Sequence, residues 1–224
     1  VATYVPRLFN KVHTGIDCPV KRAVSPEVIC SLMTDRKPLP GKLAFSRDLF
    51  VLLFLLRGMP FVDLAFLRRC DLQGNVITYH RRKTSRKLTV VVGKEAMEII
   101  QKYMYAIPDS PYLFPIIQNP GKDEYGQYAR MLRLQNYRLT QVANIWGIRD
   151  RLSTYTARHT WATTALRQNY NSSLICDAMG HSSVKVTETY FQPYRDDEVN
   201  RMNSSLITYI LSKKKRGTDK KIRS

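Results

Sequence analysis

The chain is short of acidic residues. Its 224 residues contain 18 Asp and Glu against 36 Lys and Arg, which gives a formal net charge of +18 at pH 7 and a pI near 10.0. A field of this sign attracts polyanions and disfavours basic partners. Charge alone leaves two classes open, a protein that acts on nucleic acid and a merely basic soluble protein of the ribosomal kind.

Cysteine and histidine are also scarce, with four of each and no C-x-x-C pair. They are scattered along the chain: Cys18, Cys30, Cys70, Cys176, His13, His80, His159 and His181. This spacing fits neither a zinc site nor a disulfide scaffold, so we expect reduced thiols and no metal or other cofactor. Clustered carboxylates that could hold two metal ions are missing, which disfavours a metal-dependent nuclease.

Long apolar runs are absent as well. None approaches the roughly 20 residues that a membrane span requires, and the first residues do not form a signal peptide. We therefore expect no membrane association. Residues 1–20 are basic, are interrupted by Pro and Gly, and lack a starting Met. We expect them to be a linker that follows a missing N-terminal domain, which would make the chain a fragment.

What the chain does contain is material for one folded core, with 44% hydrophobic and 10% aromatic residues. Ser25 and Pro26 predict a capped helix start, and Leu49, Leu52 and Leu53 predict a buried helix. Two β-rich runs, 76–79 and 88–92, predict a hairpin. The remaining patterns predict helices over 94–105, 123–146, 157–169, 172–179, 184–191 and 196–211. The fold class predicted is mainly α with a small antiparallel β-sheet (α+β).

The most informative residues lie between 153 and 194. Metal-free cleavage of a phosphodiester needs a nucleophile, cations for the nonbridging oxygens and a proton donor for the leaving oxygen. Arg158 can grip two phosphate oxygens and is predicted to open a helix, and Gly180 suits the end of the next helix. His181 follows in the turn, and Tyr190 comes nine residues later.

These residues resemble the second conserved box of the tyrosine recombinases (phage integrases): 158–163 reads Arg-His-Thr-Trp-Ala-Thr, and 179–183 reads Met-Gly-His-Ser-Ser. The resemblance covers about residues 21–205. It implies that Arg158 binds the scissile phosphate, that His181 hydrogen-bonds it, and that Tyr190 forms a 3′-phosphotyrosyl intermediate without metal or ATP. The amino-acid sequence of residues 156–163 looks most like that of integrases of Bacteroides-type bacteria and their mobile elements.

The resemblance also assigns a role to the hairpin turn, which holds five bases and no acid between 81 and 87. In the family a hairpin Lys protonates the leaving 5′ oxygen, and Lys83 best matches it. Arg82 and Arg86 compete for this assignment, but Arg is a poor proton donor at neutral pH. The other bases, Arg81, Arg82, Arg86 and Lys87, are expected to bind DNA. The alternative is a solvated basic turn that only touches phosphates.

Two positions depart from the family pattern. Pro60 stands where the first family Arg is expected, and Arg57, about one helical turn earlier, is predicted to replace it. The alternative is that Arg57 is structural and another base compensates. Tyr155 stands where the family has His or Lys. Its phenol can donate a hydrogen bond to phosphate but is a poor base at neutral pH, and a core Tyr is an equal alternative.

Several other residues are given plainer roles. Trp146, Trp161 and Phe114 are expected in the core, and His159 is expected to pack on its helix. Tyr194 could be mistaken for the nucleophile, but the nine-residue step from His181 selects Tyr190.

Three functions stay open at this point: an active recombinase, a catalytically impaired DNA-binding relative of the same fold, and a type IB topoisomerase-like enzyme. For the first, the family implies double-stranded DNA as partner, with a homotetramer on DNA and a monomer in free solution. We expect a catalytic domain over 21–195, a C-terminal helix over 196–211 that docks in trans or on its own domain, and a basic disordered tail over 212–224. The expected location is the bacterial cytoplasm, associated with DNA.

Overall fold

The computed structural model describes residues 23–35, 37–181 and 203–207. The chain divides into two compact units, Val1–Phe191 and Gln192–Ser224, so the short helical stretch 203–207 belongs to the second unit. The expected linker, the helix 184–191, most of the helix 196–211 and the basic tail lie outside the described residues.

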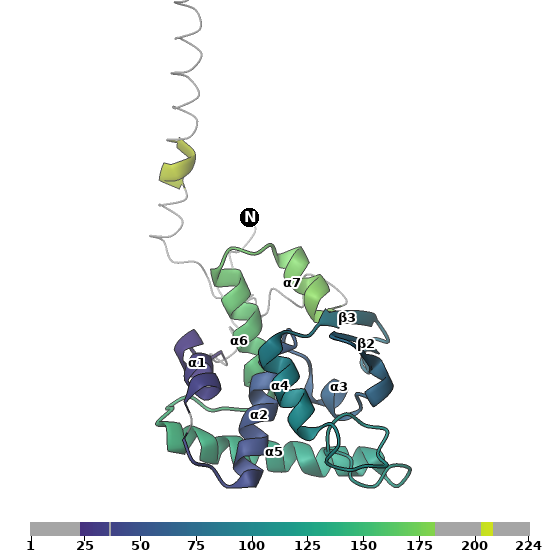
Figure 1. Cartoon of the computed structure of the whole chain (residues 1–224). Helices are drawn as coiled ribbons and strands as arrows, with labels where there is room; N and C mark the ends of the chain where they lie inside the picture. Colours follow the sequence, from purple (N-terminus) through teal and green to yellow (C-terminus); the bar gives the residue numbers. More distant parts are fainter. Residues whose placement is uncertain (1–22, 36, 182–202, 208–224) are drawn as a thin grey trace, which may run out of the picture. The chain divides into compact units, whose positions relative to one another are not determined.

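Within the first unit, helices dominate and one small antiparallel sheet is present, which confirms the predicted fold class (Figure 1). The helices are α1 Pro26–Thr34, α2 Gly41–Leu55, α3 Phe61–Ala65, α4 Lys94–Tyr103, α5 Glu124–Trp146, α6 Thr154–Arg167 and α7 Ser172–Met179, with the 3₁₀ turn η1 Arg69–Asp71. The strands are β1 Leu72–Gln73, β2 Val76–His80 and β3 Lys87–Val91. Of the helices described, none is long and apolar enough to cross a membrane.

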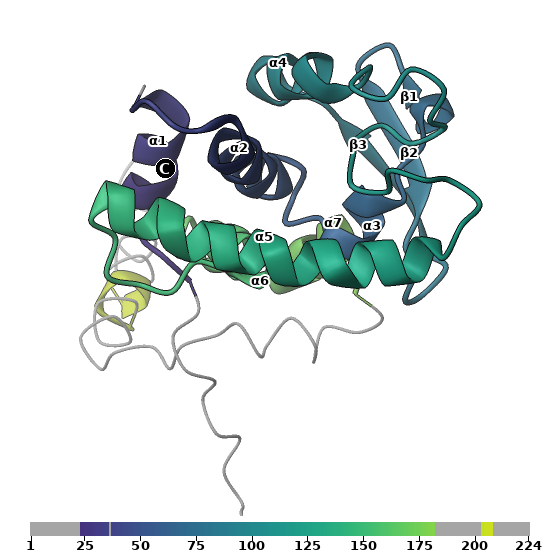
Figure 2. The ribbon, with the colours of Figure 1, turned by 90° about the horizontal axis from the view of Figure 1, so that it is seen from below.

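The core is built around α2. This helix contacts α1, α4, α5 and α6, and Figures 1 and 2 show it enclosed by them. Leu49, Leu52 and Leu53 are completely buried, as their pattern predicted. Because neighbours cover α2 on several sides, it is apolar nearly all round and has no marked polar stripe. The C-terminal end of this rigid element carries Arg57 and Gly58.

The sheet has the order β1-β2-β3. The predicted hairpin is confirmed, with Ile77 paired to Val90 and the His80–Lys87 pair next to the turn. Ile77 and Val90 are buried on the inner face. The strand β1 was not predicted, because two residues are too few to show an alternating pattern. The hairpin therefore projects residues 81–86 from a three-stranded sheet.

Two helix starts differ from prediction. Pro26 is the first residue of α1, but the Ser25 side chain makes no capping hydrogen bond. The helix expected at 157 begins at Thr154, because Ser153 and Thr156 form a capping box in which each side chain accepts from the other's backbone N–H. Arg158 is therefore the fifth residue of α6 and does not open it.

Apolar residues of α6 pack against α7 in a second cluster that is separate from the main core. Ala162 packs with Ile175 and Met179 of α7, and Trp161 lies partly buried against them. Of the other aromatic residues expected in the core, Phe114 is fully buried in the main core. Trp146 is partly buried and packs against the main core. The second cluster attaches α7, and with it His181, to the helix that carries Arg158.

Candidate active site

Arg158 joins the ends of two other helices. It is buried, with 4% of its surface exposed, and its Nη1 donates to the carbonyl oxygen of Gly58 just after α2. Its Nη2 donates to the carbonyl of Met179 at 3.0 Å and lies 2.7 Å from Nε2 of His181. These carbonyls lie near helix C-termini, where such oxygens lack intrahelical partners. The two residues predicted to bind phosphate are thus in direct contact.

His181 is held neutral by its surroundings. Because a guanidinium only donates hydrogen bonds, Nε2 of His181 accepts from Arg158, and the ring proton lies on Nδ1. Burial lowers the pKa of His181 to about 4, and the positive charges of Arg158, Arg81 and Lys83 add to this shift. The imidazole therefore lies in a strongly positive potential, where an anion would be stabilised.

Two glycines permit this close arrangement. Gly58 has φ +66°, and a Cβ atom there would lie 3.0 Å from the Cα of Arg158. Gly180 has φ +63°, as its predicted place after a helix requires, and a Cβ atom there would meet the side chain of Arg81 at 2.7 Å. A side chain at Gly58 would press on the backbone of Arg158, one at Gly180 would displace the side chains of Arg81 and Leu88, and either would be strained at its positive φ.

Arg57 lies next to this centre, one residue before Gly58. Its φ of +59° is left-handed, a conformation that costs a non-glycine residue about 1 kcal/mol or more and recurs at functional sites. Its Nη1 donates to the carbonyl oxygen of Thr89 on β3 at 3.3 Å. It also lines a largely apolar pocket of about 510 Å³ together with residues of α6 and α7, Trp161 among them.

Lys83 lies at the tip of the hairpin turn. The side chain is exposed and close enough to His181 for its charge to lower the pKa of the imidazole. The turn is closed by the Arg81 N–H to the Arg86 carbonyl at 2.9 Å and by the Ser85 N–H to the Arg81 carbonyl at 2.7 Å. The predicted general acid is therefore brought near the predicted phosphate ligands.

The other bases of the turn make different contacts. Arg81 is 7% exposed and donates to the carbonyl of Gly180. Arg86 donates to the carbonyl of His181 at 3.1 Å and to Asp177 at 2.9 Å, and Arg82 stacks over the ring of Phe66 at 3.8 Å. Lys87 is exposed. DNA contact by these four stays a prediction, but Arg81 and Arg86 are already engaged with the protein.

Asp63 belongs to this site and was not predicted as a functional residue. It is 3% exposed, its Oδ1 accepts from the backbone N–H of Arg82 at 3.0 Å, and its Oδ2 lies 3.5 Å from Nε of Arg81. Burial raises its pKa, against the effect of these partners. The signal in the sequence that could have pointed to it is its place three residues after Pro60, where the family pattern was already under consideration. Asp63 anchors the base of the hairpin to α3.

Tyr155 lies one turn before Arg158 on α6. It is 48% exposed, so the core alternative is wrong, and its ring contacts that of His159 edge-on at 4.5 Å. His159 is buried, as its expected packing role requires. A phosphate contact by Tyr155 stays a prediction. Tyr190 and Tyr194 lie outside the described residues.

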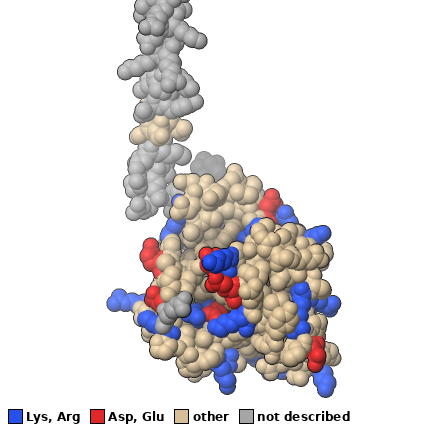
Figure 3. Space-filling model, viewed as in Figure 1, with Lys and Arg blue, Asp and Glu red and all other residues tan. Residues whose placement is uncertain are grey.

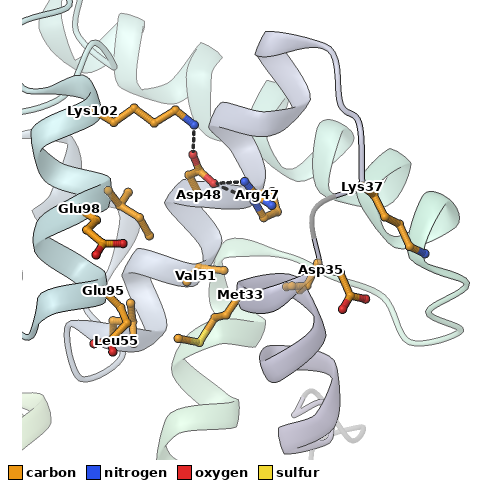
Figure 4. A pocket seen from close by; sticks show the side chains of 12 residues that line it. Met33, Asp35, Lys37, Arg47, Asp48, Val51, Leu55, Glu95, Glu98 and Lys102 are labelled. Carbon is orange, nitrogen blue, oxygen red and sulfur yellow. Dashed lines mark hydrogen bonds and ion pairs between the residues drawn. The ribbon is translucent and has the colours of Figure 1, made fainter.

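A second hollow differs in charge. It lies between α1, α2 and α4 and measures about 470 Å³, and Figure 3 shows acidic and basic side chains gathered around it. Its lining includes Asp35, Asp48, Glu95 and Glu98 (Figure 4). Lys37, Arg47 and Lys102 line it as well, so the carboxylates outnumber the bases and the hollow has no excess of positive charge to attract phosphate.

The chemistry of the first centre is that of an anion site. Its guanidinium groups never lose their protons and are held by fixed hydrogen bonds. In the part of the chain that the structure describes, no three His, Cys, Asp or Glu side chains lie close enough to hold a metal ion. Arg158 and His181 stay the predicted phosphate ligands, with Arg57 and Lys83 predicted to act beside them.

Comparison with known proteins shows the family and the fold. Residues 23–196 match the Phage integrase family. Among solved structures, the XerA recombinase has a TM-score of 0.57 at 19% identity over 82% of this chain and 64% of that one. XerH bound to its difH substrate has a TM-score of 0.61 at 15% identity over 82% and 54%. The Tn1549 transposon integrase in complex with transposon right end DNA has a TM-score of 0.59 at 14% identity over 83% and 66%.

At these identities the structures show a shared fold. The chain spans roughly half to two thirds of the length of each of these three proteins. No curated protein matches the sequence. The family match extends over most of the chain and includes Arg57, Lys83, Arg158, His181 and Tyr190. The chain therefore belongs to the phage integrase family of tyrosine recombinases.

Proposed function

We propose that the chain is the catalytic domain of a site-specific DNA recombinase that cuts and rejoins double-stranded DNA through a 3′-phosphotyrosyl intermediate. The observation that carries this proposal is the buried contact of Arg158 with His181, 2.7 Å apart where the ends of α2 and α7 meet α6. The DNA complexes of XerH and the Tn1549 integrase, which share the fold, support DNA as the substrate. The segment 156–163 supports an origin in Bacteroides-type mobile elements.

In the reaction we propose, the phenol of Tyr190 loses its proton to water, its oxygen attacks the scissile phosphorus, and the bond from phosphorus to the 5′ oxygen breaks. Arg158 and Arg57 neutralise the charge that develops on the nonbridging oxygens, and His181 adds a hydrogen bond. Lys83 gives its proton to the departing 5′ oxygen. Attack by a 5′ hydroxyl on the phosphotyrosine reverses these steps, so strand exchange needs neither metal nor ATP.

The supporting roles follow from position. Tyr155, half-exposed one turn before Arg158, is proposed to donate a hydrogen bond to the phosphate. Lys87 and Arg82 are proposed to contact the DNA backbone beside the cut. Both are exposed, and an Arg stacked on an aromatic ring can still present N–H groups to a phosphate.

The first test is covalent trapping. A pool of nicked duplexes with randomised core sequences is incubated with the protein, and adducts are separated on a denaturing gel. Tyr190→Phe keeps the ring but lacks the attacking oxygen, so the adduct should disappear while DNA binding remains. Tyr194→Phe is the matched control and should keep the adduct. An adduct from Tyr190→Phe but none from Tyr194→Phe would move the nucleophile to Tyr194.

The same assay separates the alternatives. Sequence-selective adducts that form in EDTA and without ATP support the recombinase. Binding with no adduct from the wild-type protein indicates a catalytically impaired relative. Adducts without sequence preference, together with relaxation of supercoiled plasmid, indicate a topoisomerase-like enzyme.

Assembly is part of the proposal. Exchange between two duplexes needs four cuts, so we propose a monomer in free solution and a homotetramer on DNA, in the bacterial cytoplasm and without membrane attachment. The segment 196–211 would dock on the neighbouring protomer in the assembled complex. Truncation after Arg195 should leave cleavage by single protomers detectable and abolish strand exchange. Recombination at the wild-type rate by the truncated protein would remove the docking role.

A further inference from the structure

The hairpin turn is attached to the end of α7 at two points, one on each side of the turn. Arg81 precedes the turn and donates to the carbonyl of Gly180, and Arg86 follows it and donates to the carbonyl of His181. These are consecutive carbonyls just past the C-terminus of α7. The segment that carries His181 is therefore hydrogen-bonded to both ends of the turn that carries Lys83.

Physical reasons favour these contacts. Carbonyls at a helix C-terminus lack intrahelical donors and lie at the negative end of the helix dipole, so cations bind there. Gly180 has no Cβ, which lets the Arg81 side chain pass close to the backbone. Asp177, in the last turn of α7, accepts from Nη2 of Arg86 while Nη1 bonds the carbonyl of His181. The planar fork of Arg86 therefore fixes both distance and angle.

We propose that Arg86, oriented by Asp177, is a positioning residue that holds the Lys83 turn in register with His181. Arg81, oriented by Asp63 at 3.5 Å, fixes the other side of the turn. This inference rests on the proposed function and deepens it. Lys83 and His181 come from segments about a hundred positions apart, and general acid catalysis requires a positioned donor. The bonds of Arg86 set that position before DNA binds.

This role differs from the DNA contact that the basic turn predicted. A phosphate contact on DNA needs mainly positive charge, whereas a clamp needs the two-pronged geometry of guanidinium. Arg86→Lys keeps the charge and removes the fork, so it separates the two roles. Asp177→Asn is a second variant that leaves the bond of Arg86 to the His181 carbonyl in place and removes the orienting charge.

The kinetic test compares two substrates in single-turnover cleavage. With an ordinary 5′-oxygen leaving group, Arg86→Lys should be slower by about ten- to a hundredfold, part of what a positioned general acid contributes. With a bridging 5′-sulfur, which departs without protonation, its rate should be close to that of the wild type. Lys83→Ala should show the same pattern, and Asp177→Asn should show it more weakly. DNA affinity and its salt dependence should not change in Arg86→Lys.

The matched control is Arg130→Lys. Arg130 forms an exposed pair with Asp123 at 3.5 Å, similar in kind to the Arg86–Asp177 pair but on α5. This variant should match the wild type on both substrates. Equal slowing of Arg86→Lys on oxygen and sulfur substrates would overturn the proposal. Full cleavage rates in Arg86→Lys, with or without a change in DNA affinity, would overturn it as well.

A measurement without DNA keeps this inference separate from the proposed function. Amide hydrogen exchange of the 80–88 segment should be faster in Arg86→Lys than in the wild type and in Arg130→Lys, because the turn loses its attachment to α7. Unchanged exchange there would overturn the clamp, even if the protein cleaves DNA. Faster exchange in a protein that forms no adduct would support the clamp and contradict the recombinase assignment.

Discussion

Two clusters in this protein stabilise a buried charge by opposite kinds of partner. In the Asp48 cluster (Arg47, Asp48, Lys102, Tyr103), one buried carboxylate accepts from Arg47 and Lys102 at 2.7 Å (Figure 4). The same carboxylate accepts from the Tyr103 hydroxyl at 2.6 Å. In the Arg158 cluster (Gly58, Arg158, Met179, His181), a buried cation donates to two carbonyls and an imidazole, all neutral.

The difference between the two clusters shows in the pKa values of the groups within and beside them. Although burial alone would lower it, the pKa of Lys102 is raised by its bonds to Asp48 and Tyr103, and burial together with Asp48 raises the pKa of Tyr103 to about 12. The pKa of His181 is instead lowered to about 4 by burial and by the surrounding cations. In the Asp48 cluster the positive and negative charges neutralise one another, so this cluster serves the fold. The Arg158 cluster keeps a positive potential that can act on an anion.

The largest effect is expected from Arg158→Lys. It keeps the charge but cannot donate at once to the carbonyls of Gly58 and Met179 and to His181. Cleavage should fall by about a hundred- to a thousandfold, as when one positioned donor for a developing charge is removed. The measurement is single-turnover adduct formation at saturating DNA. Wild-type cleavage would mean that charge alone suffices in the Arg158 cluster.

The next effect concerns pH. The pKa of His181 is lower in the folded protein than the usual 6.5, so the unfolded state binds more protons as pH falls from 6.5 to about 4. The free energy of unfolding should therefore decrease across this window, by up to about 3 kcal/mol, and keep its full value above it.

The measurement is urea denaturation of the wild type and His181→Gln at several pH values. Asp63 contributes a slope of opposite sign, because its pKa is raised, so the difference between the two proteins is the quantity to compare. Parallel curves for the two proteins from pH 7 to pH 4 would contradict a buried neutral His181.

A smaller effect is expected from Asp48→Asn. Loss of the carboxylate charge leaves two cations and a phenol around one amide, but the Lys102 side chain is about half exposed and can turn to solvent. Unfolding should require about 1–2 kcal/mol less free energy, and the cleavage rate per folded molecule should not change. Denaturation and adduct assays on the same preparation check this. Lost cleavage with unchanged stability would mean that the Asp48 cluster acts on the reaction.

Much of the fold could be predicted because its signals are local. Helix α7 was predicted at its exact bounds, and α5 and the hairpin to within one residue, since caps, glycines and periodicity lie within the segments themselves. The start of α6 was missed by three residues because the Ser153–Thr156 capping box was not recognised. The elements α3, η1 and β1 are too short to show a period.

The candidate site divides in the same way. Arg158, His181 and Lys83 were identified from the resemblance of their segments to the tyrosine recombinases, and in the structure Arg158 contacts His181 with Lys83 nearby. That Arg81 and Arg86 bond carbonyls of the protein could not be predicted, because a basic turn has the same composition whether its arginines face DNA or a helix end. Asp63 was passed over because nothing local shows that it lies beneath the hairpin.

The sequence by itself determined the residue types that can bind a phosphate, the helices and hairpin that carry them, and the family to which they belong. Tertiary structure decided which groups surround each charge. Asp48 and Asp63 are both buried carboxylates near basic residues, but Asp48 accepts from the side chains of Arg47 and Lys102, whereas Asp63 accepts from a backbone N–H and lies 3.5 Å from Arg81. The physical reason is that a charge depends on every neighbour within a few ångströms, and in this chain those neighbours come from segments up to about a hundred residues apart.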